Sequence, residues 1–198
     1  MLIQLKKNMK IASHNSWSYL TPKTWWMKLI RFAARCQDVS VYEQYDLGVR
    51  GFDLRVRFDE HNQPQLVHGC VIYKSAVSIC EYLYDLNCKK DVYVRVILDV
   101  RTKKQYTVRQ IDNFKDFCSA IEDMFPDIKF YCGDCLYNHI NLYDFKNHPT
   151  CEELYSSVCP PKLIDDWYPR WYAKRNNKKN IEKGTDKDFL MIDFVNIR

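Results

Sequence analysis

Two histidines, two carboxylates and one arginine are the residues of this sequence that could perform chemistry together. Asp53 and Arg55 share one face of a predicted strand, because side chains two residues apart point the same way. His14, His68 and Asp193 lie in or directly after other predicted strands. Histidine can take up or release a proton near neutral pH, and an arginine fork can hold two phosphate oxygens. Phosphodiester cleavage needs a base, an acid and a cation, so this set of residue types favours phosphodiester chemistry.

Predicted strands and helices alternate along the chain, and these elements must position the five residues. Apolar or alternating runs predict strands at 9–12, 51–58, 65–73, 92–100, 128–131 and 189–195. Helical spacing predicts helices within 17–35, behind an N-cap at Ser40, and at 75–86 and 107–125. Residues 132–184 carry no clear pattern.

This alternation predicts an α/β protein with a parallel sheet or barrel. The carboxyl ends of barrel strands form the active-site face, which is where the histidines and carboxylates are expected to meet. A complete eight-stranded barrel takes about 250 residues. With 198 residues, we expect one domain over 1–198 and a compact or distorted TIM-type barrel.

Several motifs give the sequence a family resemblance. Ser13-His14-Asn15-Ser16, the segment 41–44, the segment 47–55 and Val67-His68-Gly69 together resemble the X-domain of phosphatidylinositol-specific phospholipases C. The similarity extends over residues 9–101 and is fainter beyond, where 189–195 is similar to a late strand that carries an aspartate. The resemblance implies a PLC-like phosphodiesterase that acts on phosphatidylinositol, a phosphoric diester hydrolase or lyase of lipid metabolism.

The resemblance also implies a role for each catalytic residue. His14 would deprotonate the inositol 2-hydroxyl, whose oxygen would attack phosphorus and leave a cyclic phosphodiester. His68 would protonate the departing diacylglycerol oxygen, with Asp53 supporting it. Arg55 would bind the phosphate, and Asp193 would orient His14.

Two basic residues make the chain resemble the metal-independent, bacterial-type branch. Calcium-dependent members carry carboxylates where this chain has Arg55 and Arg101. Hard divalent ions prefer oxygen ligands, and two guanidinium groups would repel them. Arg55 is therefore expected to replace the metal, with no cofactor, while Arg101 and Asn15 are expected to bind substrate. Asn15 departs from the aspartate usual in the bacterial type.

Two other functions remain open. A metal-dependent glycerophosphodiester phosphodiesterase would share the barrel, but would carry a metal-binding carboxylate pair where this chain has Asp53-Leu54-Arg55. A non-catalytic module that binds lipid or inositol phosphate would not require two histidines. Survival of activity in a chelator separates the first alternative from the principal interpretation.

The nine cysteines are odd in number and scattered through apolar segments, which favours a reducing compartment such as the cytoplasm. Secretion stays an alternative. The cluster Cys132, Cys135, His139, His148 and Cys151 could ligate zinc, but its spacing is not that of a known finger, and free thiols are the favoured interpretation.

A net charge of +5 and clustered aromatic residues suggest contact with a phospholipid surface. Trp25, Trp26 and the run 167–172, followed by the basic run 174–179, could enter a bilayer interface. A partly buried aromatic cluster beside a solvated basic loop is the favoured alternative. The sequence carries no nucleic-acid module. We expect a monomer that visits membranes peripherally.

Overall fold

The computed structural model describes residues 9–100, 102–133, 141–146, 155–157 and 167–197. Its strands are β1 (Lys10–Ser13), β2 (Thr21–Pro22), β3 (Val49–Phe58), β4 (Pro64–His68), β5 (Val71–Lys74), β6 (Tyr93–Leu98), β7 (Lys129–Cys132), β8 (Tyr155–Ser157) and β9 (Phe189–Ile192). Its helices are α1 (Trp25–Leu29), α2 (Arg31–Ala34), α3 (Val41–Asp46), α4 (Ile79–Asn87), α5 (Val108–Met124) and α8 (Pro169–Lys183).

Six strands run parallel in the order β7-β6-β3-β1-β9-β8. The long strand β3 also pairs through its carboxyl-terminal half with β4, which leads into the antiparallel pairs β4-β5 and β2-β5. Among the described residues the sheet does not close, because no pairing joins β7 to β8. The predicted distorted α/β barrel is therefore confirmed.

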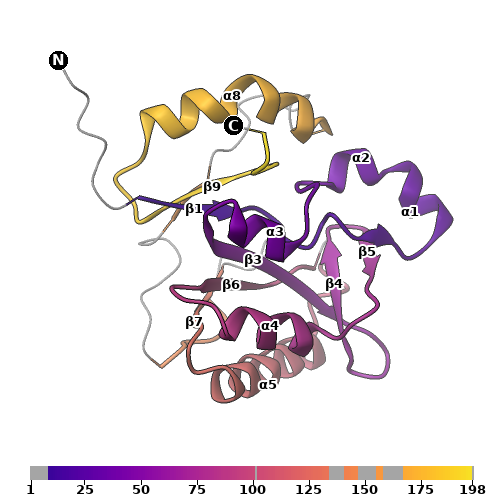
Figure 1. Cartoon of the computed structure of the whole chain (residues 1–198). Coiled ribbons are helices and arrows are strands. Elements are labelled where there is room, and N and C mark those ends of the chain that lie inside the picture. Colours follow the sequence, from indigo (N-terminus) through magenta and orange to yellow (C-terminus); the bar gives the residue numbers. More distant parts are fainter. Residues whose placement is uncertain (1–8, 101, 134–140, 147–154, 158–166, 198) are drawn as a thin grey trace.

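Helices cover the outer side of this sheet (Figure 1). The side chains of β3 that point outward, Phe52, Leu54 and Val56, are fully buried in the main hydrophobic core. Helix α5 contributes Phe114, Cys118 and Ile121 to the same core, as its helical spacing predicts. Helices α3 and α4 each begin with a capping box, and that of α3 confirms the N-cap predicted at Ser40.

The inner side of the sheet has a different composition. A small apolar group fills its amino-terminal end: Ala12, Tyr131, Phe189 and Met191, with Tyr93 packed against them. Beyond this group, toward the carboxyl ends of the strands, the inward positions of β3 are Asp53, Arg55 and Arg57. Strand alternation thus sends apolar side chains to the helices and charged side chains to the barrel interior.

Three sequence-based predictions were wrong in detail. Residues 65–73 form two antiparallel strands, because Gly69 takes a positive φ of 58° and turns the chain. The segment 17–35 begins with a buried Trp17 and forms the two-residue strand β2 and the short helices α1 and α2. The basic run 174–179 belongs to helix α8 and is not a loop.

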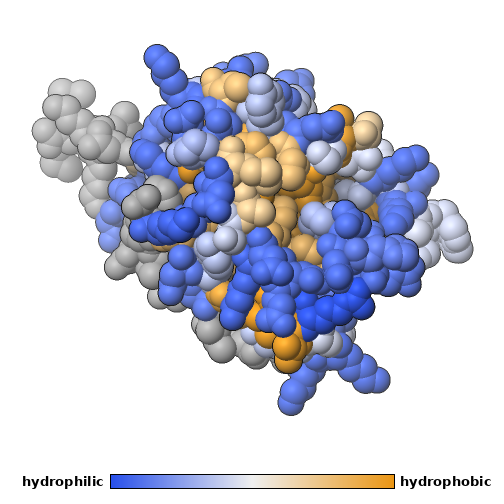
Figure 2. Space-filling model, turned by 90° about the horizontal axis from the view of Figure 1, so that it is seen from below, coloured by the Kyte–Doolittle hydropathy of each residue, from blue (hydrophilic) through white to orange (hydrophobic). Residues whose placement is uncertain are grey.

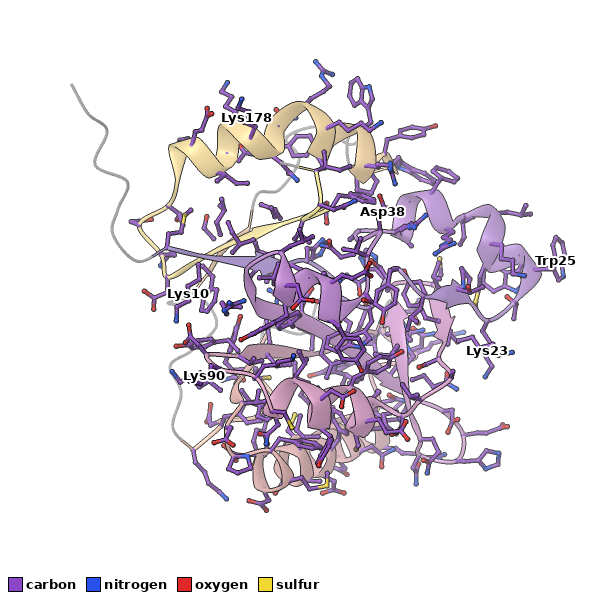
Figure 3. The ribbon with its side chains drawn as sticks, in the orientation of Figure 1. Lys10, Lys23, Trp25, Asp38, Lys90 and Lys178 are labelled. Atoms are coloured by element: carbon purple, nitrogen blue, oxygen red, sulfur yellow. The ribbon has the colours of Figure 1, made fainter. Side chains whose placement is uncertain are left out.

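Apolar side chains are exposed on more than one side of the molecule. Trp25, the first residue of α1, is 74% exposed and projects away from the body of the protein (Figure 3). The face seen from below is mostly hydrophilic, with apolar side chains near its middle (Figure 2). Within the described residues, no helix has the length and apolar character needed to span a bilayer.

Candidate active site

Strand register brings the predicted site residues to one level of the barrel. Ser13 of β1 pairs with Phe52 of β3 and with Ile192 of β9. These three residues are followed along the chain by His14, Asp53 and Asp193. The three side chains therefore lie beside one another. Asp53 pairs in turn with Arg95 of β6. Four polar residues that are distant in sequence thus form one row across four parallel strands.

His14 is held from both sides of its ring. Its Nδ1 lies 2.8 Å from Asp193 Oδ1, and its Nε2 lies 2.7 Å from Arg55 Nη2. A guanidinium group can only donate, so Nε2 accepts from Arg55 and the proton of the neutral imidazole sits on Nδ1, facing Asp193. The His14 side chain is 26% exposed and therefore open to solvent and ligands.

Asp53 is the buried anion at the centre of the row. Its carboxylate accepts from Arg55 Nε at 2.9 Å, from Arg95 Nε at 2.8 Å and from the backbone N–H of Asn15 at 2.9 Å. Burial alone would raise the pKa of Asp53, but the Arg55 and Arg95 guanidinium groups hold it well below its usual range. Asp53 stays ionised at every physiological pH and fixes the position of Arg55.

His68 approaches from the antiparallel strand β4. Strand β4 pairs with β3 at Leu66 opposite Val56, and His68 is its last residue. The His68 and His14 rings are 5.6 Å apart between centroids and meet edge to face. The two histidines therefore lie within reach of one phosphodiester group.

A helix end orients the His68 ring. His68 Nδ1 lies 2.8 Å from the carbonyl oxygen of Ala34, the last residue of α2, whose carbonyl has no partner within the helix. His68 Nδ1 donates this hydrogen bond, which leaves the Nε2 lone pair available to accept a proton. Burial, then Arg55 and then His14 lower the pKa of His68 to about 4.

Two buried charged residues were missed at the sequence level. Arg95 interrupts the β-branched run of β6 and binds Asp53. Asp99 follows β6, accepts from the Gly69 backbone N–H at 2.9 Å, and lies 3.9 Å from Arg55 Nη1. A charged residue inside an apolar strand was the available signal in both cases.

Two more missed residues come from the segment after α2. Gln37 is fully buried and donates to the carbonyl oxygens of His14 and Ile192, each at 3.1 Å. Cys36 is 2% exposed, with its Sγ 3.9 Å from His68 Nδ1. Burial and the neighbouring Asp193 raise the pKa of the Cys36 thiol. Nothing in the sequence around these residues signalled a place beside the histidines.

The structure brings most of the predicted site residues together: His14, Asn15, Asp53, Arg55, His68 and Asp193. Arg101 lies outside the described residues. Among the described residues no hydrogen bond joins Asp53 to His68, so the supporting role of Asp53 toward His68 stays a prediction.

The alternative zinc set lies largely outside the described residues. Cys132 is buried in β7, whereas Cys135, His139, His148 and Cys151 are not described. Among the described residues, Cys36, Cys70, Cys80, Cys88 and Cys118 are free thiols.

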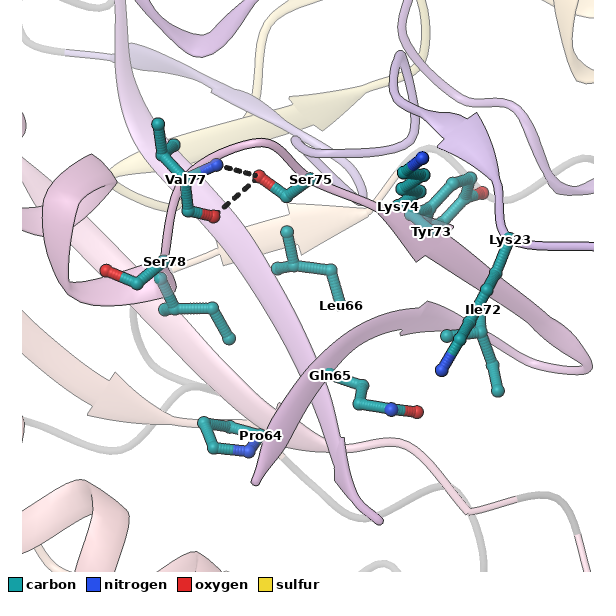
Figure 4. A pocket seen from close by; sticks show the side chains of 11 residues that line it. Lys23, Pro64, Gln65, Leu66, Ile72, Tyr73, Lys74, Ser75, Val77 and Ser78 are labelled. Atoms are coloured by element: carbon teal, nitrogen blue, oxygen red, sulfur yellow. Dashed lines mark hydrogen bonds between the residues drawn. The ribbon is translucent and has the colours of Figure 1, made fainter.

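A separate groove of about 500 Å³ runs along the β4-β5 edge (Figure 4). Lys23, Gln65 and Tyr73 help to line it, and Ser75 hydrogen-bonds to the backbone of Val77 at its rim. The described residues that line this groove include no histidine and no carboxylate. The histidines and carboxylates of the candidate site therefore lie at the barrel mouth and not in this groove.

Comparison with known proteins identifies the fold. No protein-family model and no curated protein sequence matches the chain. Among solved structures, phosphatidylinositol-specific phospholipase C from Staphylococcus aureus matches with a TM-score of 0.55 and 13% identity, over 94% of this chain and 86% of that one. The chain has the fold of a bacterial phospholipase C.

Two further structures agree with this fold. A double mutant of the S. aureus enzyme matches with a TM-score of 0.58 and 14% identity, over 94% of this chain and 86% of that one. The phosphatidylinositol-specific phospholipase C of Listeria monocytogenes matches with a TM-score of 0.53 and 14% identity, over 97% of this chain and 91% of that one. The likeness spans most of both chains although few residues are identical.

Proposed function

We propose that this protein is a phosphodiesterase that cleaves phosphatidylinositol or a related phosphodiester by acid–base catalysis, forming a cyclic phosphate without a metal. The observation that carries the proposal is the arrangement of His14. Asp193 accepts the hydrogen bond from Nδ1, and the Nε2 lone pair points to Arg55, a cation suited to binding phosphate. A base and an anion-binding group thus converge on one point.

In the proposed reaction, Arg55 Nη2 shifts its hydrogen bond from His14 Nε2 to a phosphoryl oxygen of the bound substrate. The freed Nε2 then takes the proton of the inositol 2-hydroxyl while that oxygen attacks phosphorus. The bond from phosphorus to the diacylglycerol oxygen breaks, and His68 Nε2 supplies the proton that this oxygen needs. The products are diacylglycerol and a cyclic inositol phosphodiester. Asp193 keeps the Nδ1 proton of His14 in place and stabilises the imidazolium that forms.

The low pKa of His68 requires substrate to assist the acid step. The free site favours a neutral His68, because burial and Arg55 oppose its protonation. A bound phosphodiester brings a negative charge between Arg55 and His68, which offsets the guanidinium and raises the pKa of His68. Substrate binding would therefore charge the acid that the reaction consumes.

Arg55 takes the place that a calcium ion would hold. Calcium needs six to eight oxygen ligands, but both carboxylate oxygens of Asp53 already accept from Arg55, Arg95 and the Asn15 backbone. Arg55 is itself 9% exposed and anchored by Asp53, so little ordering is needed when phosphate binds. This arrangement supports metal-independent stabilisation of the phosphoryl oxygens.

Asn15 supplies a further reason to expect a bound oxygen. Its Nδ2 is buried and has no hydrogen-bond partner among the described residues. An orphaned buried donor costs about 1–3 kcal/mol, which a ligand oxygen would recover. Asn15 takes a positive φ of 43°, a conformation that asparagine tolerates. We assign Asn15 to substrate binding, and Arg101 stays a predicted partner in that role.

The site is connected to an aromatic surface suited to lipid. Phe32 of α2 stacks on Tyr168, 5.6 Å away between ring centroids, so α1, α2 and the start of α8 form one surface. Trp25, Trp167 and Trp171 on this surface are each at least half exposed. Helix α2 ends at Ala34, which holds His68. A bilayer contacted by this aromatic surface would lie next to the acid–base pair.

The deciding assay measures cleavage of phosphatidylinositol in vesicles with a chelator present. Phosphorus NMR detects the cyclic product. We expect turnover in EDTA, and a loss of about 10²-fold to 10⁴-fold in His14→Ala or His68→Ala, because each removes a positioned proton-transfer group. His61→Ala is the matched control, since His61 lies in an exposed turn with a 78% exposed side chain.

Two results would overturn the proposal. Turnover that disappears in EDTA and returns with calcium would refute the substitution of Arg55 for a metal. Wild-type rates in both His14→Ala and His68→Ala would refute the acid–base assignment. Folding of each variant is checked by circular dichroism, so that a loss of structure is not mistaken for a loss of chemistry.

A further inference from the structure

A thiol lies beside the two histidines, and the proposed reaction does not use it. One nitrogen of His14, one nitrogen of His68 and Cys36 Sγ all lie within 4.8 Å of one another. The closest measured pair is Cys36 Sγ and His68 Nδ1, at 3.9 Å. Cys36 comes from the segment after α2, His14 from the end of β1 and His68 from the end of β4. Tertiary structure alone brings these three groups together.

The separations are close to those of a metal centre. Zinc binds sulfur at about 2.3 Å and imidazole nitrogen at about 2.0–2.1 Å, so tetrahedral ligand atoms lie about 3.3–3.6 Å apart. The three groups would have to close in by up to about 1.5 Å, within the reach of side-chain rotation. Asp193 contacts the opposite, Nδ1 side of the His14 ring, so a water molecule is expected to complete the coordination of an ion bound at Nε2.

The charges around the cluster permit a soft cation although they disfavour calcium. Three buried or half-buried guanidinium groups, Arg55, Arg57 and Arg95, are balanced by Asp53, Asp99 and Asp193. A thiolate from Cys36 would offset half the charge of a divalent ion. Two imidazoles and one thiolate are ligands that zinc prefers and calcium does not.

We propose that His14, Cys36 and His68 form a binding site for a thiophilic divalent ion such as Zn²⁺, which inhibits the enzyme when bound. The inhibitory part rests on the proposed function, because the ion would occupy the base and the acid at once. Binding releases the Cys36 proton to solvent, and the ion competes with Arg55 for the His14 Nε2 lone pair. Zinc would thereby act as a reversible off-switch on a reaction that itself uses no metal.

Cobalt spectroscopy tests the site without reference to activity. Metal-free, reduced protein is titrated with Co²⁺ in a Cys135→Ser/Cys151→Ser background, which removes two thiols of the alternative zinc set. We expect a thiolate-to-cobalt charge-transfer band and visible bands of tetrahedral cobalt. Cys36→Ser in the same background should lose the charge-transfer band. Its affinity for zinc, measured by competition with a chromophoric chelator, should fall by roughly tenfold or more.

The exposed cysteines provide the matched control. Cys80→Ser/Cys88→Ser removes two thiols that lie at the surface, in and directly after α4. We expect cobalt spectra unchanged from the background protein. If the charge-transfer band survives in Cys36→Ser, or vanishes in Cys80→Ser/Cys88→Ser, the assignment of Cys36 is overturned. A circular dichroism spectrum equal to that of the background protein confirms that Cys36→Ser is folded.

Inhibition is measured separately, with each protein compared with its own rate in EDTA. Micromolar zinc should reduce turnover of phosphatidylinositol in the background protein, and EDTA should restore it, while Cys36→Ser should require roughly tenfold more zinc or more. A cobalt signal with no turnover in any buffer refutes the proposed function and leaves the metal site standing. Turnover that zinc does not reduce refutes the off-switch.

Discussion

Asp53 shows at the scale of a single residue how the site is stabilised. Its buried carboxylate accepts from two arginines and one backbone N–H, so three elements of the site depend on it. Breaking such an ion pair is costly because the remaining charges stay buried without a partner. The same contacts prevent Asp53 from offering free oxygens to a hard metal.

Asp53→Asn should therefore destabilise the fold as well as impair phosphate binding. We expect a loss of about 3–5 kcal/mol in the free energy of unfolding, measured by urea titration, since the Arg55 and Arg95 charges lose their counterion. Asp91→Asn is the matched control. Asp91 pairs with Lys10 at 2.8 Å near the surface, where an ion pair contributes about 1 kcal/mol or less. Equal losses in the two variants would contradict the central role of Asp53.

His68 should titrate well below an ordinary histidine in the free protein. Its folded-state pKa of about 4 lies below the unfolded value of 6.5, so folding favours the neutral ring. The stability that results is complete above pH 6.5 and is lost as the pH falls toward 4. Imidazole NMR titration, assigned with His68→Gln, should give a low midpoint that rises when inositol phosphate binds. A midpoint at or above 6.5 without ligand would contradict the effect of burial and Arg55.

At the scale of elements, the contact among β1, β3 and β9 sets the register of the site. A Cβ added at Gly51 would lie 2.7 Å from Ala12 Cβ and 3.0 Å from Phe189 Cδ1. Real Cβ atoms do not approach so closely, so glycine is required where β3 passes β1 and β9. The close approach of these strands places His14, Asp53 and Asp193 at one level.

Gly51→Ala should loosen this contact and misalign the row. We expect a loss of about 1–3 kcal/mol in the free energy of unfolding, the usual effect of overpacking, together with reduced turnover. The paired variant Gly51→Ala/Ala12→Gly removes the closest clash and should recover part of the loss. If the urea midpoint of unfolding of Gly51→Ala equals that of the wild type, the spacing of these strands does not depend on glycine.

At the scale of the whole molecule, exposed aromatic residues lie on the side that leads to His68. Trp25 projects outward from α1, and Arg175 of α8 lies 4.1 Å from the Trp171 ring centroid. Lys178 adds basic charge along the outside of α8 (Figure 3). Aromatic rings with nearby cations are suited to an anionic bilayer interface.

Trp25→Ala should weaken binding to vesicles that contain phosphatidylinositol. Burying a large apolar side chain contributes about 1.5–3 kcal/mol, so the vesicle affinity should fall by about tenfold or more in a sedimentation assay. Turnover of a water-soluble inositol phosphodiester should not change. Tyr84→Ala, on α4, is the control, because Tyr84 is 65% exposed but lies away from α1. A larger effect of Tyr84→Ala would move the lipid contact to the α4 face.

Local sequence patterns were sufficient for most elements and for the identity of the chemical groups. Period-2 alternation located β3, helical spacing located α5, and the N-cap at Ser40 located α3. These signals survive because each depends on neighbours within a few residues. The helices predicted in 17–35 and the single strand predicted in 65–73 were less accurate, because turns and short helices there depend on distant packing partners.

The sequence by itself determined that His14, Asp53, Arg55, His68 and Asp193 would lie in or directly after strands, since residue type and alternation are local properties. Only the tertiary structure decided what each of them contacts. Strand register, a non-local property, set Arg95 and Asp193 beside Asp53 and His14, and the end of α2 delivered Ala34 and Cys36 to His68. Both the low pKa of His68 and the proposed metal site arise from these long-range contacts.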